Sequence, residues 1–225
     1  MVALLLGGTS LFAQLTPYEY GHRWYFSVQG GSVMFTGDHS GSLYKFGSVH
    51  KMFSAGGSAA LGYNITDAHE IRFAAVYGRR NDVCEPFTFE DPVTGDKETT
   101  IYTYSFRTAQ LFADYVLNFN ALAEYNVALT PRAYFGLGAA VTYDFSDPGH
   151  PEVWLSDPNL VPGYRMGAIL EYDFPSGFGF FGDLGIAFYL DRFNGRQLTG
   201  MPVDIDLALQ FGMIYHFQLA KNARR

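Results

Sequence analysis

The chain has 225 residues, a formal net charge of −7, 48% apolar residues and 25 glycines. Charged residues make up only 16% and aromatic residues 17%. So few charges and so many aromatic side chains exclude a disordered chain, and the acidic balance argues against nucleic acid as a partner. The sequence contains no run of about 18 apolar residues that could form a membrane-spanning helix. A glycine-rich β protein remains, either soluble or in a membrane.

The N-terminal residues 1–13 predict a secretory signal peptide that is cleaved after Ala13, because an apolar run is followed by small and polar residues. No Lys or Arg precedes the apolar run, which is expected if the signal is truncated at its start. An apolar N-terminal strand is the alternative. The lone Cys84 cannot form an intrachain disulfide.

Apolar residues alternate with small or polar residues along most of the chain, which is the two-residue period of strands with two unlike faces. The pattern is clearest in 133–145, where Phe135 and Leu137 alternate with Gly136 and Gly138. Eight segments follow it, and we predict strands over 24–36, 51–64, 69–80, 101–119, 127–145, 162–174, 178–192 and 203–217. In the first segment the alternation changes phase at Gly30-Gly31, which predicts a bulge or a kink.

The connections between these segments alternate in length. Three are short, namely 65–68, 120–126 and 175–177, and four are longer and polar, namely 37–50, 81–100, 146–161 and 193–202. Strict alternation places all long loops at one end of an up-and-down sheet and both termini at the other. We therefore expect an eight-stranded antiparallel up-and-down β-barrel, although a soluble barrel would alternate in the same way.

The small-residue face indicates which side of the barrel is inside. A soluble exterior favours Lys and Glu over Gly and Ala, whereas a narrow eight-stranded lumen needs small side chains. We therefore expect the apolar face to contact lipid, with aromatic girdles near the strand ends that include Tyr143 and Phe145. The inward face then carries a network of charges of both signs: Glu70, Arg72, Asp114, Arg132, Arg165, Glu171, Asp183 and Asp206. Mutual pairing that fills the lumen is the expected role of these charges, and a gate or ion path is the alternative.

The last segment carries alternating apolar residues that end in an aromatic pair: Leu209, Phe211, Met213, Tyr215 and Phe217. These positions resemble the terminal-strand signal of outer-membrane β-barrels, which the barrel assembly machinery reads. The family signal usually ends the chain, whereas here a basic tail, 218–225, follows it.

More broadly, residues 22–217 resemble the small OmpA/OmpX-like barrels. The segment SLFAQ and the pair Gly37-Asp38 further resemble the porin-like outer-membrane β-barrel proteins of Bacteroidetes. The resemblance implies a transmembrane barrel over 14–217 in the bacterial outer membrane, with periplasmic termini. Its partners would be outer-membrane lipid and lipopolysaccharide, and the barrel assembly machinery during insertion.

No motif in the sequence predicts a catalytic residue, a metal site or a cofactor. We therefore expect a non-enzymatic surface or structural barrel, or an accessory subunit of an outer-membrane complex, whose external loops contact a protein partner through Trp154. Two alternatives stay open. The run Asp38-His39-Ser40 has the residue types of a lipid A-modifying enzyme of the outer leaflet, and the lumen could form a small, narrow pore.

Overall fold

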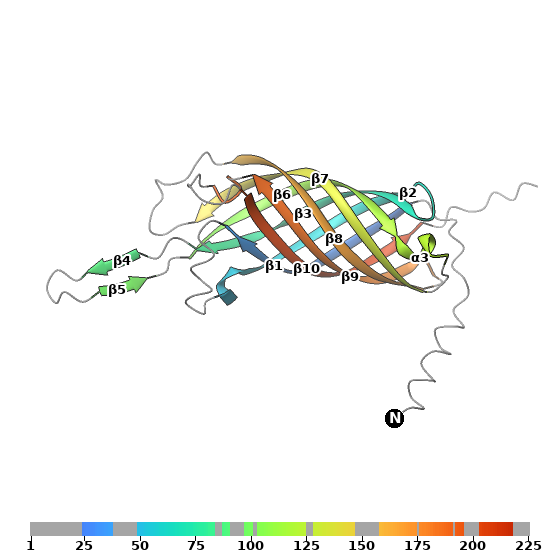
Figure 1. The fold of residues 1–225 in the computed structure, drawn as a ribbon, viewed down its shortest axis with the longest axis horizontal. Coiled ribbons are helices and arrows are strands. Elements are labelled where there is room, and N and C mark those ends of the chain that lie inside the picture. Colours follow the sequence, from blue (N-terminus) through green and yellow to red (C-terminus); the bar gives the residue numbers. More distant parts are fainter. Residues whose placement is uncertain are drawn as a thin grey trace, which may run out of the picture.

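The structure is a computed structural model, and it describes residues 24–37, 49–83, 87–90, 97–100, 103–124, 128–146, 158–174, 176–190, 192–195 and 203–217. Eight long strands close into a barrel in the order β1-β10-β9-β8-β7-β6-β3-β2 (Figure 1). Every neighbouring pair is antiparallel. The predicted eight-stranded antiparallel up-and-down β-barrel is therefore confirmed.

The strand bounds agree with the predicted segments to within a few residues. The barrel strands are β1 (Trp24–Thr36), β2 (Phe53–Asn64), β3 (His69–Val83), β6 (Thr103–Asn118), β7 (Leu129–Ser146), β8 (Asn159–Asp173), β9 (Phe178–Leu190) and β10 (Val203–His216). A separate hairpin of β4 (Phe87–Glu90) and β5 (Lys97–Thr100), which the sequence did not predict, lies in one long connection. Within the described residues, no helix has the length and apolar character needed to cross a membrane.

Two short helical turns adjoin the strands. The 3-10 turn η1 (Val49–Met52) leads into β2, and α3 (Phe119–Leu122) lies in the connection from β6 to β7. The side chain of Asn118 caps α3, because it accepts hydrogen bonds from the backbone N–H groups of Asn120 and Ala121. At the same end of the barrel, the N–H of Phe217 donates to the carbonyl of Trp24 at 2.9 Å. The start of β1 and the end of β10 therefore lie side by side at the short-turn end.

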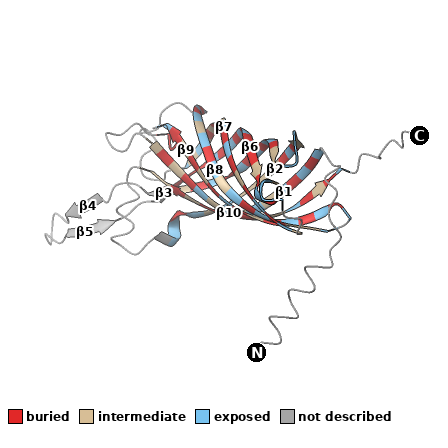
Figure 2. Cartoon of the chain, turned by 45° about the vertical axis from the view of Figure 1, so that its right-hand side comes forward, coloured by how far each residue is buried: buried red, intermediate tan, exposed pale blue. Residues whose placement is uncertain are grey.

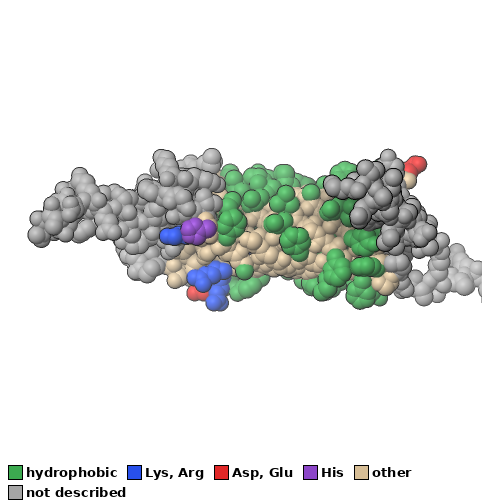
Figure 3. All heavy atoms as spheres, turned by 90° about the horizontal axis from the view of Figure 1, so that it is seen from below, with side chains coloured by type: hydrophobic (Ala, Val, Ile, Leu, Met, Phe, Trp, Pro, Cys, Tyr) green, Lys and Arg blue, Asp and Glu red, His purple; other side chains and the backbone are tan. Residues whose placement is uncertain are grey.

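Burial alternates residue by residue along the strands (Figure 2). Outward side chains are apolar and widely exposed, with Leu111 69% and Leu137 63% accessible. They form a band around the barrel, and Lys, Arg and His side chains, with an acidic side chain beside them, lie at the loop end of that band on the face drawn in Figure 3. Small residues such as Gly138 face the interior. The barrel is thus apolar outside and polar inside, which is the reverse of a soluble barrel.

The bulge predicted at Gly30-Gly31 is wrong. The register of β1 against β10 runs unbroken from Tyr25 opposite His216 to Thr36 opposite Ile205. The apparent change of phase arises because two apolar residues, Val33 and Phe35, point into the lumen, where they are 1% and 0% exposed. In the sequence, an apolar residue on the inward face gives the same pattern of alternation as a shift of register.

A register shift occurs instead near the loop end of β7. The pairing of β6 with β7 slips between Ser105 and Arg107, and Asp144 opposite this point has φ +56°. The extra residue in β7 reverses the side of the sheet to which the next side chain points. Phe145, predicted to face outward in a girdle, therefore packs against the interior, with its ring centroid 5.5 Å from that of Phe106.

We predict that Gly138→Ala destabilises the barrel by about 1–3 kcal/mol, because the added methyl group would overlap the Leu111 carbonyl and the Phe112 ring. The matched control is Gly182→Ala in β9, where the added Cβ would face the flexible Phe211 side chain at 3.4 Å. Denaturant titration of the refolded protein in lipid vesicles would measure both. Equal losses of stability in the two variants would contradict the inward assignment of Gly138.

Candidate functional site

The structure places all eight charged residues of the expected network inside the barrel, each at most 8% exposed. The alternation of each strand aims these side chains inward, and barrel closure brings together charges that are distant in sequence. They fall into three groups along the barrel, at the turn end, in the centre and toward the loops. We treat this interior as the candidate site, because it holds most of the buried ionisable groups among the described residues.

The turn-end group is centred on Arg132. Its Nη1 and Nη2 atoms donate to Glu70 and Glu171, each at 2.9 Å. The Nε2 atom of His216 lies 3.0 Å from an oxygen of Glu171 and 3.3 Å from one of Asp173. Three carboxylates thus share one arginine and one histidine.

The same group contains the one set of residues, in the described part of the chain, that could hold a metal ion. The ligand atoms of Glu171, Asp173 and His216 lie within 4.8 Å of one another. Contacts to Arg132 and to His216 already balance the carboxylate of Glu171. The arrangement is therefore explained by hydrogen bonding and ion pairing within the chain.

The central group is built around Asp114. Its carboxylate accepts hydrogen bonds from Nε of Arg72 at 2.7 Å and from Nε and Nη2 of Arg165 at 2.8 and 2.6 Å. Asp183 lies 3.9 Å from Arg72 and accepts a hydrogen bond from the Tyr134 hydroxyl at 3.0 Å. Two arginines and two carboxylates balance in charge here.

Aromatic rings cover the two central arginines. The guanidinium of Arg72 lies 4.3 Å from the ring centroid of Tyr134, and that of Arg165 lies 4.5 Å from that of Phe112. These cation–π contacts occupy space around the ions that would otherwise need water. The glycines opposite make room, since a Cβ at Gly167 or Gly185 would come within 2.5 Å of the Tyr134 hydroxyl.

The third group lies toward the loops, where Arg80 donates through Nε to both oxygens of Asp206 at 2.8 and 2.7 Å. Amide side chains complete it: Gln110 accepts from the Tyr189 hydroxyl at 2.8 Å, and Gln29 donates to Gln210 at 2.7 Å. A cavity of about 40 Å³ lies beside these residues, and another of about 10 Å³ lies near Arg132. Such cavities hold a few water molecules at most.

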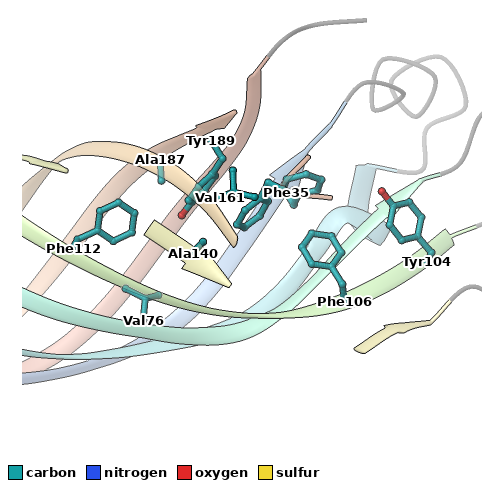
Figure 4. Packing of buried hydrophobic residues seen from close by; sticks show 10 residues of the cluster. Phe35, Val76, Tyr104, Phe106, Phe112, Ala140, Val161, Ala187 and Tyr189 are labelled. Atoms are coloured by element: carbon teal, nitrogen blue, oxygen red, sulfur yellow. The ribbon is translucent and has the colours of Figure 1, made fainter. Parts of the chain in front are cut away.

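An aromatic cluster lies above the third group at the loop end (Figure 4). Phe193 stacks on Tyr189 with ring centroids 3.9 Å apart, and it contacts Phe35 and Phe106 at 5.5 and 5.6 Å. All four rings are at most 2% exposed. Within the described residues, the lumen is therefore blocked by rings above and by ion pairs below.

Three members of the network, Arg80, Asp173 and His216, were absent from the sequence-based set. Arg80 stands at the last position of the predicted strand 69–80, in phase with Glu70 and Arg72, while Asp173 is in phase with Glu171 and His216 with Asp206. Extending the two-residue period to the strand ends would have found all three. Their partners could not be found in this way, because Arg80 and Asp206 are 126 residues apart.

The remaining predicted residues divide between the outer face and the loops. Leu209, Phe211, Met213, Tyr215 and Phe217 lie along one outward face at the end of the chain's last strand. His50 is exposed in η1. The loop residues Trp154, Asp38, His39 and Ser40, the N-terminal residues 1–13 and the tail 218–225 lie outside the described residues.

Comparison with known proteins gives similarity at the level of structure alone. No family model and no curated protein matches the chain. The attachment invasion locus protein Ail of Yersinia pestis is 14% identical with a TM-score of 0.46, covering 87% of this chain and 99% of that one. Neisserial surface protein A is 16% identical with a TM-score of 0.45, and the match covers 86% of this chain and 97% of that one. A major outer membrane protein from Thermus thermophilus is 15% identical with a TM-score of 0.48, and the match covers 87% of this chain and 100% of that one.

We predict that Asp114→Asn lowers the free energy of unfolding by about 3–5 kcal/mol, because it leaves Arg72 and Arg165 buried without a counter-charge. The matched control is Asp144→Asn, which removes the carboxylate of a pair with Arg107 whose side chains are 54% and 58% exposed. That loss should be at most about 1 kcal/mol. Denaturant titration in lipid vesicles measures both. A small effect at Asp114 would show that the central ion pairs are dispensable for the barrel.

Proposed function

We propose that this protein is a non-enzymatic β-barrel of the bacterial outer membrane whose interior serves stability and whose external loops contact a partner. One observation carries the proposal: the lumen is filled by paired ions and stacked rings, while the outer face is apolar. An exposed band that includes Phe73 (62%) and Phe211 (66%) is costly in water and favourable in lipid. We place the termini in the periplasm and the long loops outside, as short periplasmic turns require.

The filled interior favours a surface role over a pore. Ions would have to pass the Arg80–Asp206 pair and the rings of Phe35, Phe106 and Phe193, where the side chains are 5% exposed or less. A conducting path would need these contacts to break, which is expensive for a buried ion pair. The small OmpA/OmpX-like barrels, including those of Bacteroidetes, remain the family that we propose for this chain.

Planar-bilayer recording tests the closed interior. We expect no discrete conductance steps from the refolded chain, because the three groups of paired charges fill the lumen that the described residues enclose. The double variant Arg80→Ala/Asp206→Ala, which removes both charges together, serves as a comparison for a loosened lumen. Regular steps from the unaltered chain at neutral pH would contradict the proposal and favour the narrow pore.

Purification from native membranes in mild detergent tests the loop contact. The chain should fractionate with outer membranes, shift in gel mobility on heating and carry a partner with it. Shortening the loops within 38–48, 84–101, 147–157 and 196–201 should remove the partner and keep the heat-dependent shift. These limits spare the buried residues Met52, Phe193 and Asn194.

A variant altered at Thr66 and Asp67, in the short turn at the other end, is the control and should keep the partner. Trp154→Ala should weaken the partner's retention, because tryptophan is enriched among the residues that anchor interfaces. Retention of the partner by the chain with all four loops shortened would contradict the proposed loop contact.

A further inference from the structure

The exposed charges of the described residues separate toward opposite ends of the barrel. Four exposed cations lie at the loop end, in η1, β3, β6 and the segment after β9, namely Lys51, Arg79, Arg107 and Arg192. The exposed acids Asp67 and Glu124 lie in short connections at the turn end, and Asp144 is the one exposed acid at the loop end among the residues whose exposure the structure describes. Among the residues whose exposure is described, cations therefore outnumber acids beside the apolar band at the loop end, and part of this group is visible in Figure 3.

Two of these cations occupy an unusual position. Arg79 on β3 and Arg107 on β6 are direct register partners, and both are exposed. Like charges directly opposite one another destabilise a sheet. A single carboxylate stands beside them, since Asp144 lies 3.0 Å from Nε of Arg107, while Nη2 of Arg79 donates to the Ser105 hydroxyl at 2.5 Å. The pair of arginines keeps a net positive charge.

The surroundings of the pair indicate what could neutralise it. Tyr77, 53% exposed, stands two residues along β3 from Arg79 toward the apolar band. Tyr143 is the partner of Arg107 on β7. Tyrosines at the border of an apolar band mark the head-group level of a bilayer. The guanidinium groups therefore stand where lipid head groups would lie.

We propose that Arg79 and Arg107 form a binding site for a phosphate monoester on the head group of an outer-leaflet lipid. The site rests on the proposed location in the outer membrane. A phosphate monoester carries about −1.5 to −2 charges near neutral pH, so it is attracted by the net positive charge that remains on the two arginines beside Asp144. Guanidinium groups bind phosphate oxygens in a planar, two-pronged geometry. The ion pair with Asp144 orients the Arg107 side chain, and the hydrogen bond to the Ser105 hydroxyl orients the Arg79 side chain.

The experiment uses the full chain refolded into phosphatidylcholine nanodiscs with either phosphorylated lipid A or its dephosphorylated form. Native mass spectrometry measures the apparent affinity for each lipid. The unaltered chain should bind the phosphorylated form about tenfold more tightly, as expected for charge-assisted contacts. Arg79→Gln/Arg107→Gln should lose this preference, whereas Lys51→Gln/Arg192→Gln, which removes two charges from the same end, should keep it.

Several outcomes would overturn the site. Equal binding of the two lipids by the unaltered chain would do so, as would equal loss of preference in both double variants, which would indicate a diffuse charge effect. Displacement of the lipid by millimolar inorganic phosphate would indicate a site for the free ion instead. Gel mobility before and after heating reports whether each variant is folded. Failure of the unaltered chain to enter nanodiscs would contradict the proposed membrane function as well as the site.

Discussion

Ion pairing inside a closed, narrow lumen is the constraint on which the rest of this structure depends. Eight strands leave an interior only wide enough for side chains, so a buried charge there must find its partner within the chain. Arg132 on β7 reaches Glu70 on β3, and Arg80 on β3 reaches Asp206 on β10. Neither pair joins neighbouring strands in the sheet order. The pairs therefore stabilise the closed cross-section, beyond what the strand ladder supplies.

Small and large residues share the same lumen because the ion pairs need room. Tyr134 covers Arg72 and lies against Gly167 and Gly185 on the next strands. Replacing those glycines by larger residues would push the ring into the ions, so the glycine content serves packing. The same packing of rings and glycines around paired ions explains how the interior accommodates its charged side chains.

A filled lumen leaves the chemistry of this barrel to its surfaces. Among the residues whose exposure is described, the exterior offers an apolar band, four cations at the loop end and two acids at the turn end. The proposed orientation, with the long loops outside, would place these cations beside the head groups of the outer leaflet.

Local alternation in the sequence determined the strands, their two faces and the end at which the loops gather, because a side-chain period of two is a property of each strand alone. It placed Asp114, Arg165 and Asp183 inside and Leu209 and Phe211 outside without any knowledge of their neighbours. It failed at Val33 and Phe35, where apolar residues face inward, and at Phe145, which a bulge at Asp144 reverses.

Only the tertiary structure determined which acidic side chain pairs with which basic side chain. Asp114 meets Arg72 as its register partner on the neighbouring strand β3, and it reaches Arg165 on β8 across the intervening strand β7. No spacing along the chain encodes either contact. The aromatic closure of Phe35, Phe106, Tyr189 and Phe193 likewise gathers residues from four places in the sequence. The sequence determined the two faces because that information is local, whereas pairing across the lumen depends on strand order and stagger, which exist only once the sheet has closed.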